Sequence, residues 1–361
     1  MPTLTATGFR LQRHYLAARA GTGELAAVAR RLCGLHAQVL SSADLILWAR
    51  VRGHRSDALE SALWEERSLV KTWLMRGTLH LVTADDLPLY VGAVDNRGEY
   101  QPAWLRAFEV EAVEMERLIE AIADALDGRA LTREELAAQV RPRIGARLAK
   151  RLSSGWGEFL KPAARRGVLC FGPSRGQNVT FVRPDQWLAG WRAPPSRPEA
   201  RTELLCRFLA AYGPASAADF EHWLGVNRRV KEPWEAMRGE LEEVAPKSFL
   251  LARDRQSLER ARARGVRLLP AFDPFVLFPR SARPVANEWT TRVYRTAGWI
   301  SATVVDRGRV VGVWEHRVRG RRLALRVEAF GDLGEAARLG TVREARRLAR
   351  YVDAQLDLST A

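Results

Sequence analysis

The fold is decided by the stretch LTREELAAQVRPRIGARLAKRLSSGWGEFLKPAARRGVLCFG, residues 131–172. Thr132 and Glu135 stand at the three-residue spacing of a capping box, which predicts the start of a helix. A helix over 110–127 precedes this stretch, and a further helix and two strands, VLCFG and NVTFV, complete the pattern. Helix, capped helix, helix and two strands joined by a loop is the order of a winged helix-turn-helix module.

The same order returns over residues 199–252. EARTELLCRFLAAYG predicts a helix that stops at a glycine, Ser216 is placed to cap AADFEHWLG, and LEEVA and SFLLA predict two short strands. The Pro-rich segment RAPPSRPEA (192–200) predicts a linker between the two modules. Thr132 and Ser216 are 84 residues apart, about the length of one module, which indicates a tandem repeat.

The two ends of the chain complete the expected organisation. Near the N-terminus, the apolar spacing predicts helices over 8–20, 24–36 and 57–65, and a strand or short hairpin over 69–82. In the C-terminal third, 298–330 has β-branched runs broken at two glycine turns, which predicts a three-stranded meander, and an amphipathic helix over 334–356 follows. We therefore expect an α+β protein with winged-helix modules at 1–108, 109–192 and 199–265, and a C-terminal β-rich region at 266–361.

Charge is the strongest global signal. The 361 residues carry a formal net charge of +15, with 57 basic against 42 acidic residues, and 52 of the basic residues are arginine. A GC-rich genome would favour arginine over lysine, but it explains the excess of cations less well. A surface this basic attracts polyanions, which predicts salt-dependent nucleic-acid binding.

Several classes of protein are disfavoured. No apolar run reaches the ~18 residues that a membrane span needs, and the first residues lack the apolar region of a secretory signal. The three cysteines lie far apart, and the six histidines form neither an HExxH motif nor a zinc-type cluster. We expect a cytoplasmic, nucleoid-associated protein with no bound metal and no cofactor.

Six segments are informative together, namely RLCGLHAQ, MRGTLHLVTADDLPLY, WGEFLKPAARRGVLCFGP, YGPASAADFEHWLG, LLPAFDPFVLF and VVDRGRVVGVWE. They resemble the AlkZ/YcaQ-like winged-helix DNA glycosylase family, and the resemblance runs from about residue 8 to 330. It implies three tandem winged helices and a β-rich part around a C-shaped basic channel for DNA. It also implies excision of bulky or crosslinking N7-alkylpurine lesions from double-stranded DNA, in base excision repair or in self-resistance to a DNA-alkylating natural product.

The family's catalytic motif is Gln-x-Gln, or Gln-x-Asp in one branch, and the matching positions here are His36 and Gln38, in RLCGLHAQVLSSADL (31–45). An N7-alkylguanine already carries positive charge, so the enzyme must mainly place a water and stabilise the developing sugar cation. A neutral imidazole can accept a proton from that water, whereas an amide can only hold it. We therefore expect His36 to be the base and Gln38 to hold the water or the sugar. The structural alternative is a capping or solvated pair of side chains at a helix end. The rival acids have structural explanations, because Asp44 is expected to cap a helix and Asp273 lies in a Pro-flanked turn.

Two basic segments are candidate DNA contacts. A solvated helix face is the alternative for the first segment, and a hairpin tip suited to phosphate or groove contact is expected for the second. Three tryptophans could stack on bases, but a place in the core is the better interpretation. The candidate contacts are Arg143, Arg147 and Lys150 with the neighbouring Arg151, and Arg317, Arg319, Arg321 and Arg322 around Gly320; the tryptophans are Trp156, Trp187 and Trp223.

The leading hypothesis is a monofunctional glycosylase, in which water displaces the base instead of a lysine amine. The alternative is a non-catalytic winged-helix DNA-binding protein, either a transcription regulator or a lesion sensor. Such regulators normally combine one module with an effector domain and a dimer interface. The sequence shows no heptad seam and no ligand-pocket signature, which favours a monomer that binds one DNA segment.

Overall fold

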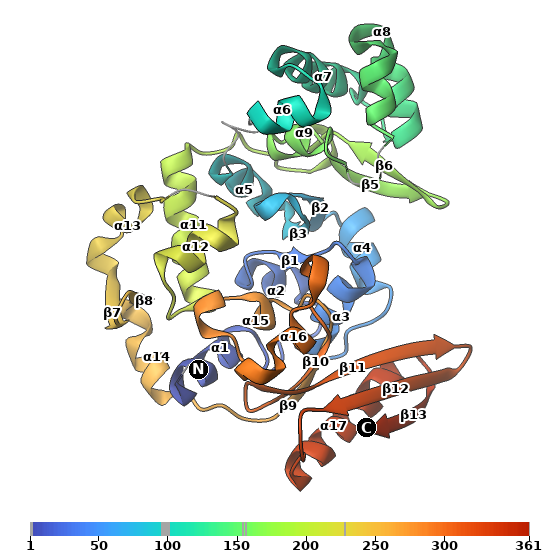
Figure 1. Ribbon diagram of the computed structural model, residues 1–361. Coiled ribbons are helices and arrows are strands. Elements are labelled where there is room, and N and C mark those ends of the chain that lie inside the picture. Colours follow the sequence, from blue (N-terminus) through green and yellow to red (C-terminus); the bar gives the residue numbers. More distant parts are fainter. Residues whose placement is uncertain (1–2, 95–101, 154, 156, 227–228, 361) are drawn as a thin grey trace. The chain divides into compact units, whose positions relative to one another are not determined.

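The computed structural model describes residues 3–94, 102–153, 155, 157–226 and 229–360. The chain is a mixed α+β protein that divides into two compact units (Figure 1). Unit 1 contains residues 1–59, 205–223 and 229–361, and unit 2 contains residues 60–204 and 224–228. Unit 1 is thus assembled from three separate stretches of chain. Unit boundaries fall inside α4 (Ala58–Trp64), α11 (Arg197–Tyr212) and α12 (Ala217–Leu224).

Unit 2 combines an antiparallel hairpin with a helical segment and a small sheet. The hairpin is β2 (Leu69–Trp73) with β3 (Leu79–Thr83), as predicted for 69–82. Capping boxes begin α7 and α8, and the predicted Thr132–Glu135 box is confirmed. The remaining elements are α5 (Leu87–Ala93), α6 (Pro102–Phe108), α7 (Ala112–Ala125), β4 (Leu131–Thr132), α8 (Arg133–Arg151), α9 (Lys161–Arg165), β5 (Cys170–Arg175), β6 (Asn178–Val182) and α10 (Pro184–Trp187).

The strands β4, β6 and β5 form an antiparallel sheet in that order. Aromatic rings join this sheet to the β2–β3 hairpin, because Trp73 lies 4.8 Å from Phe171 and 6.1 Å from Phe181 between ring centroids. All three side chains are buried. Burial of such large aromatic surfaces is the main stabilising contribution to this part of unit 2.

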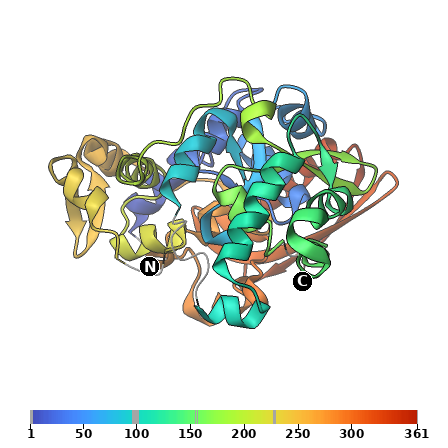
Figure 2. The same cartoon turned by 90° about the horizontal axis from the view of Figure 1, so that it is seen from above.

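The first part of unit 1 is helical, and a two-stranded hairpin follows it. The Ser216 hydroxyl accepts a hydrogen bond from the Asp219 amide at 3.2 Å, so the predicted cap of α12 is confirmed. The predicted strands LEEVA and SFLLA pair as β7 and β8, drawn in yellow at the left of Figure 2. The elements are α1 (Leu4–Arg13), α2 (Leu25–Arg31), β1 (Leu35–His36), α3 (Leu40–Arg50), α12 (Ala217–Leu224), α13 (Glu232–Ala236), β7 (Leu241–Ala245), β8 (Ser248–Leu251) and α14 (Arg255–Arg260).

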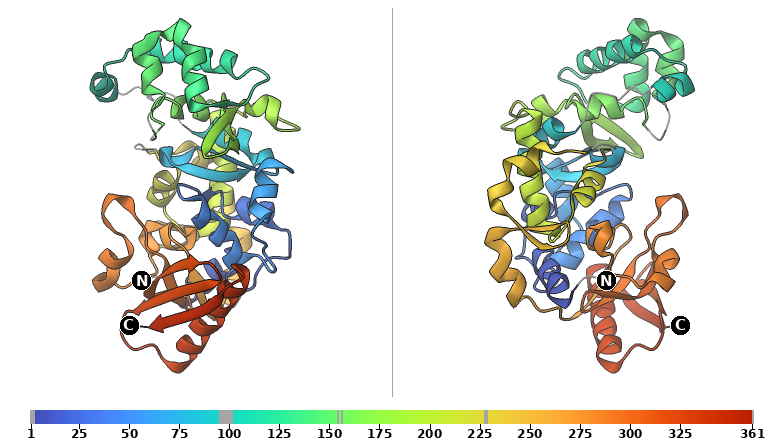
Figure 3. Two further views of the ribbon diagram at one scale, coloured as in Figure 1. Left: turned by 90° about the vertical axis from the view of Figure 1, so that its right-hand side faces the viewer. Right: turned by 60° about the vertical axis from the view of Figure 1, so that its left-hand side comes forward.

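The C-terminal part of unit 1 is a five-stranded sheet in the order β13-β12-β11-β10-β9. The pairs are antiparallel except for β12 with β13, and the predicted meander is confirmed in β10, β11 and β12. The helix α17 packs on one face of the sheet (Figures 1 and 3). The elements are β9 (Val266–Leu269), α15 (Pro274–Leu277), α16 (Thr290–Val293), β10 (Thr303–Asp306), β11 (Arg309–Arg319), β12 (Arg322–Ala329), α17 (Glu335–Tyr351) and β13 (Gln355–Thr360).

The core of unit 1 joins stretches that are distant in the sequence. Trp48 on α3, Phe275 on α15, Leu323 on β12 and Leu348 on α17 belong to one cluster of buried side chains, and each is at most 1% exposed. Tyr212, from the second of the three stretches, is also buried, and its hydroxyl donates a hydrogen bond to the Leu32 carbonyl at 2.7 Å. Unit 1 therefore cannot complete its core until its three stretches of chain have met.

Three predicted helix boundaries were wrong. The helix expected over 8–20 ends at Arg13, because Tyr15 has a left-handed φ of 55°. The helix expected over 24–36 ends at Arg31, where Cys33 and Gly34 take φ values of 54° and 89° and turn the chain into β1. The helix expected over 334–356 ends at Tyr351, and the following residues form β13. In the part of the chain that the structure describes, none of the helices has the length and apolar character for crossing a membrane.

Candidate active site

His36 is the last residue of β1 and Gln38 lies in the connection from β1 to α3, so the motif is not at the end of a helix as predicted. The His36 side chain is half-buried, and Gln38 is exposed. The imidazole stacks on the ring of Phe272, with 4.6 Å between ring centroids and 19° between the ring planes. This contact fixes the plane of the imidazole, while the neighbouring amide of Gln38 remains accessible to solvent.

Phe272 is positioned by a buried ion pair. Its φ of 60° lies in the left-handed region, which is strained for an aromatic residue, so the turn must be held from outside. Asp273 provides this support: it accepts a hydrogen bond from the Phe275 amide at 2.9 Å and caps α15. The Arg50 guanidinium donates two hydrogen bonds of 2.7 Å to the same carboxylate, and both side chains are fully buried. Asp273 therefore has the structural role that was expected.

Asp44 is not a helix cap, and that prediction was wrong. The helix α3 begins at Leu40, after a valine that makes no capping hydrogen bond with its side chain, so Asp44 falls inside the helix. Its carboxylate is 2.8 Å from Nε2 of His54 and also accepts a hydrogen bond from the Tyr351 hydroxyl. Burial, followed by the neighbouring Asp44 carboxylate, raises the pKa of Tyr351. These contacts join α3 to α17 and explain Asp44 without catalysis.

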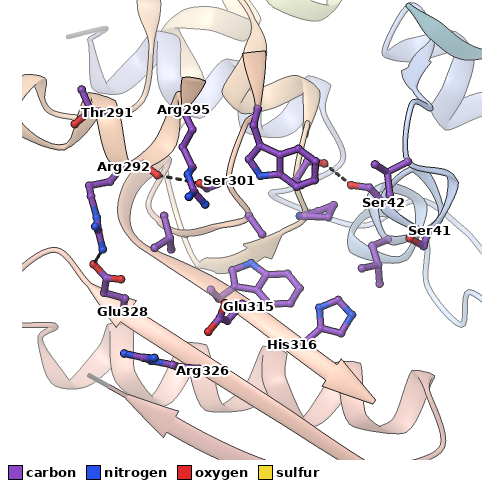
Figure 4. Close-up of a pocket in the computed structure, with 18 residues that line it drawn as sticks. Ser41, Ser42, Thr291, Arg292, Arg295, Ser301, Glu315, His316, Arg326 and Glu328 are labelled. Carbon is purple, nitrogen blue, oxygen red and sulfur yellow. Dashed lines mark hydrogen bonds and ion pairs between the residues drawn. The ribbon is translucent and has the colours of Figure 1, made fainter. Parts of the chain in front are cut away.

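A cavity of about 600 Å³ is lined by Trp299 and by Val39, the residue that follows Gln38, and we call it the Trp299 pocket. Trp299 is 44% exposed, and its ring lies edge-to-face against Phe272 with 4.9 Å between centroids. Figure 4 shows that the polar lining comes from three directions, namely α3, the segment from α16 to β10, and the strands β11 and β12. The polar residues that the argument uses are Ser41, Arg295, Glu315, His316, Arg326 and Glu328.

The hairpin of β11 and β12 carries exposed arginines at its tip, as predicted. Arg319 and Arg322 are directly opposite each other in the antiparallel register, so two like charges share one face of the sheet. Arg317 precedes Arg319 by two residues on the same strand and therefore lies on that face too. Like charges placed directly opposite each other destabilise a hairpin, and a bound polyanion would relieve this repulsion.

Two hairpin arginines have acidic partners. Arg321 is 3.3 Å from Asp353, and both side chains are more than four-fifths exposed. Arg322 is 2.9 Å from Asp357. Exposed ion pairs of this kind contribute only about 0–1 kcal/mol, so a phosphate group competes with them readily.

The basic segment on α8 is arranged differently. Gly145 has φ 80° and ψ 161°, which interrupts the helix and separates Arg143 from Arg147, so the two do not share a continuous helical face. Arg143 pairs with Asp124, and Arg147 is 2.6 Å from Glu114. Lys150 is exposed. The acids of α7 therefore partly neutralise this segment.

The tryptophans divide between core and surface. Trp223 is 2% exposed, so its predicted place in the core is confirmed. Trp187 is half-buried, and the Arg67 guanidinium lies 3.6 Å from its ring centroid. Trp156 lies outside the described residues. Among the residues that the structure describes, no group of three or more histidine, cysteine or acidic side chains is arranged to hold a metal ion.

Sequence reasoning missed Phe272 and Trp299 as parts of the site. Neither belongs to a motif with a chemical signature, and both are more than 230 residues from His36 in the sequence. The neighbouring Pro270 and Pro274 indicated a rigid turn, but they did not indicate that a ring in this turn stacks on His36. Only the tertiary structure places Phe272 against the imidazole of His36 and Trp299 against Phe272.

Known proteins resemble this chain over most of its length. The family model described as DNA glycosylase AlkZ-like matches residues 29–351. A relative from Streptomyces sahachiroi, named interstrand DNA cross-link repair glycosylase, is 39% identical over 320 residues, which are 85% of this chain and 86% of that protein. The solved structure of Streptomyces sahachiroi DNA glycosylase AlkZ superposes over 100% of both chains with a TM-score of 0.91 and 34% identity. The chain therefore belongs to the AlkZ-like DNA glycosylase family.

Proposed function

We propose that this glycosylase hydrolyses the N-glycosidic bond of N7-alkylpurines, both bulky monoadducts and interstrand crosslinks, and that His36 and Gln38 carry the reaction. The observation that supports this most directly is the imidazole of His36, held flat against Phe272 two residues from an exposed amide. An oriented proton acceptor beside a solvent-accessible amide suits the activation of a water molecule.

In the proposed reaction the lesion supplies most of the driving force. The C1′–N9 bond breaks, and its electron pair leaves with the cationic base, which becomes neutral. The oxygen of a water held by Gln38 bonds to C1′, and His36 accepts the proton that this water loses. Because the enzyme forms no covalent bond to the sugar, the reaction is monofunctional and its products are an abasic site and the free base.

DNA binding is proposed to use the cationic face of the β11–β12 hairpin, with a lesser contribution from Arg143, Arg147 and Lys150. The net charge of +15 supports phosphate contact. Winged-helix modules at 1–108, 109–192 and 199–265 and a basic channel for duplex DNA belong to this proposal. They are supported by the helix, capped helix and paired strands seen around α8 and again around α12. A monomer acting in the cytoplasm on nucleoid DNA is part of the same proposal.

Action on crosslinks is supported by the relative named as an interstrand DNA cross-link repair glycosylase. The substitution of His for the first Gln of the family's usual motif changes a group that holds water into one that can also take its proton. We therefore propose that the chemistry is retained and that its dependence on pH differs from that of Gln-x-Gln relatives.

The test is incubation with a duplex that carries one N7-methylguanine and, separately, with a duplex joined by an N7–N7 alkyl crosslink. Alkaline cleavage at the abasic site should give a strand break at the lesion, and the crosslinked duplex should separate into single strands. His36→Ala should bind the methylated duplex normally and excise slowly. Binding without any excision by the wild-type protein would instead favour a lesion sensor.

A further inference from the structure

We propose that the Trp299 pocket binds the substituent carried by the alkylated base, and that it selects flat aromatic substituents bearing hydrogen-bond acceptor oxygens. This inference rests on the proposed excision of N7-alkylpurines and specifies which of these lesions the site prefers. Trp299 and Arg295 are its specificity-determining residues.

The pocket is joined to the motif by a chain of rings. His36 stacks on Phe272 at 4.6 Å, and Phe272 contacts Trp299 at 4.9 Å between centroids. On the other side, Val39 lines the pocket and directly follows Gln38 in the sequence. A base held at the motif would therefore place a large N7 substituent within reach of the pocket.

The size of the pocket fits a substituent better than a small adduct. Its volume of about 600 Å³ falls within the range of roughly 300–1,000 Å³ found for sites that hold drug-sized molecules. A methyl group would leave almost all of this space unfilled. A polycyclic group would exclude water from it and bury its own apolar faces.

The lining specifies the chemistry of the substituent. Trp299 offers a rigid, partly exposed ring for stacking. Arg292 pairs with Glu328. The guanidinium of Arg295 is exposed and makes no ion pair or hydrogen bond with the described residues, and Figure 4 shows this side chain extending into the space above the strands. Its guanidinium provides donors for carbonyl or phenol oxygens.

A backbone phosphate is a poorer occupant. Two carboxylates, Glu315 and Glu328, line the pocket together with its arginines, and they would repel a phosphate group. The phosphates have a better site on the hairpin. In the β11–β12 register, Glu315 faces Arg326 and Arg317 faces Ala324, and the strand period of two places Glu315, Arg317 and Arg319 on the same face. The hairpin arginines therefore lie on the same face of β11 as Glu315, one of the residues that line the pocket.

The test compares two duplexes that differ only in the lesion, N7-methylguanine and N7-(hydroxynaphthyl)methylguanine. The readout is the ratio of the single-turnover excision rates, aryl over methyl, because a general structural defect lowers both rates together. We expect Trp299→Ala and Arg295→Ala each to lower this ratio by about tenfold, the typical effect of removing one stacking or charge-assisted interaction. Trp299→Phe should keep most of the ratio. Arg309→Ala removes an exposed cation at the other end of β11 and should leave the ratio unchanged.

An equal loss on both lesions in Trp299→Ala, or a wild-type protein that excises only the methyl lesion, would overturn the proposal. Binding separates this outcome from failure of the proposed function. With a 2′-fluorinated lesion sugar, which resists formation of the sugar cation, the wild-type protein should bind the aryl duplex more tightly than the methyl duplex, and Trp299→Ala should lose that preference. If the wild-type protein bound the aryl duplex more tightly but excised neither lesion, the proposed reaction would be wrong and the proposed role of the pocket would stand. If it bound the two duplexes equally, the proposed role of the pocket would be wrong.

Discussion

Replacing Asp273 by asparagine should destabilise unit 1 strongly, although the new side chain has almost the same shape. The asparagine oxygen can still accept the hydrogen bond from the Phe275 amide, but the Arg50 guanidinium would be left buried without a counter-charge. Breaking a fully buried ion pair by removing one partner costs about 3–5 kcal/mol of unfolding free energy. For a domain of about 150–250 residues this corresponds to a fall in melting temperature of roughly 6–20 °C.

The exposed pair of Arg55 and Asp57 provides a matched control. It joins the same two residue types, but the side chains are 75% and 61% exposed, so Asp57→Asn should change the melting temperature very little. The assay is thermal unfolding followed by circular dichroism, together with the excision rate measured well below the melting temperature. Asp273→Asn should also excise slowly, because Asp273 holds the turn on which Phe272 supports His36.

The double variant Arg50→Met/Asp273→Leu checks the physical cause. It removes both buried charges, so it should be more stable than Asp273→Asn although it carries one more substitution. If Asp273→Asn melted within about 2 °C of Asp57→Asn, a shift that corresponds to less than about 1 kcal/mol, the buried pair would not be holding the turn. The account of how Phe272 is positioned would then be wrong.

Four further outcomes are expected. His36→Ala should reduce the single-turnover excision rate by about 10²–10⁴-fold or less, since the lesion is already activated. His36→Gln should keep partial activity and flatten the acid limb of the pH–rate profile, because an amide has no proton to gain, and an unchanged acid limb would mean that another group titrates. The double variant Arg319→Ala/Arg321→Ala should weaken binding to all duplex sequences alike. It should also lower the magnitude of the slope of log affinity against log salt concentration by about 0.9 for each phosphate that the protein no longer neutralises. An unchanged slope would mean that the hairpin does not contact DNA. Burial, reinforced by the positive charges of Arg50 and Arg10, lowers the pKa of His14 well below its ordinary value. Below about pH 6.5 the unfolded state therefore binds a proton that the folded state does not bind, so the free energy of unfolding falls as the pH falls. The melting temperature of His14→Phe should fall less steeply than that of the wild type between about pH 6.5 and 5, and parallel curves would argue against a neutral buried His14. Excision should survive EDTA, and loss of activity that a divalent ion restores would reveal a metal requirement.

The sequence predicted best those features that depend on neighbouring residues. Thr132 with Glu135, and Ser216 with its helix, make the hydrogen bonds that their spacing predicts. The glycine turns between β10, β11 and β12 were likewise predictable, because a tight turn needs residues that tolerate positive φ.

Features that depend on distant residues were not predictable in this way. A glycine such as Gly34 commonly follows the end of a helix, but nothing in the sequence indicates that Cys33 before it also takes a left-handed conformation. The strand β13 was missed because its parallel partner, β12, lies across a whole helix in the sequence. The motif could be found from its residue types and its resemblance to a family, whereas the rings that orient it could not, because no local pattern pairs His36 with Phe272.

The discontinuous composition of unit 1 has a consequence for how the protein is made. Phe272 leaves the ribosome 236 residues after His36. At typical synthesis rates of about 5–20 residues per second, the imidazole waits roughly 10–50 s for the ring on which it stacks. Residues 60–204, which form nearly all of unit 2, emerge in the interval and form a continuous stretch that can fold first. The nascent chain therefore carries the proposed catalytic motif long before His36 can stack on Phe272. A translation product that stops before residue 272 lacks both Phe272 and the Asp273 carboxylate that anchors it.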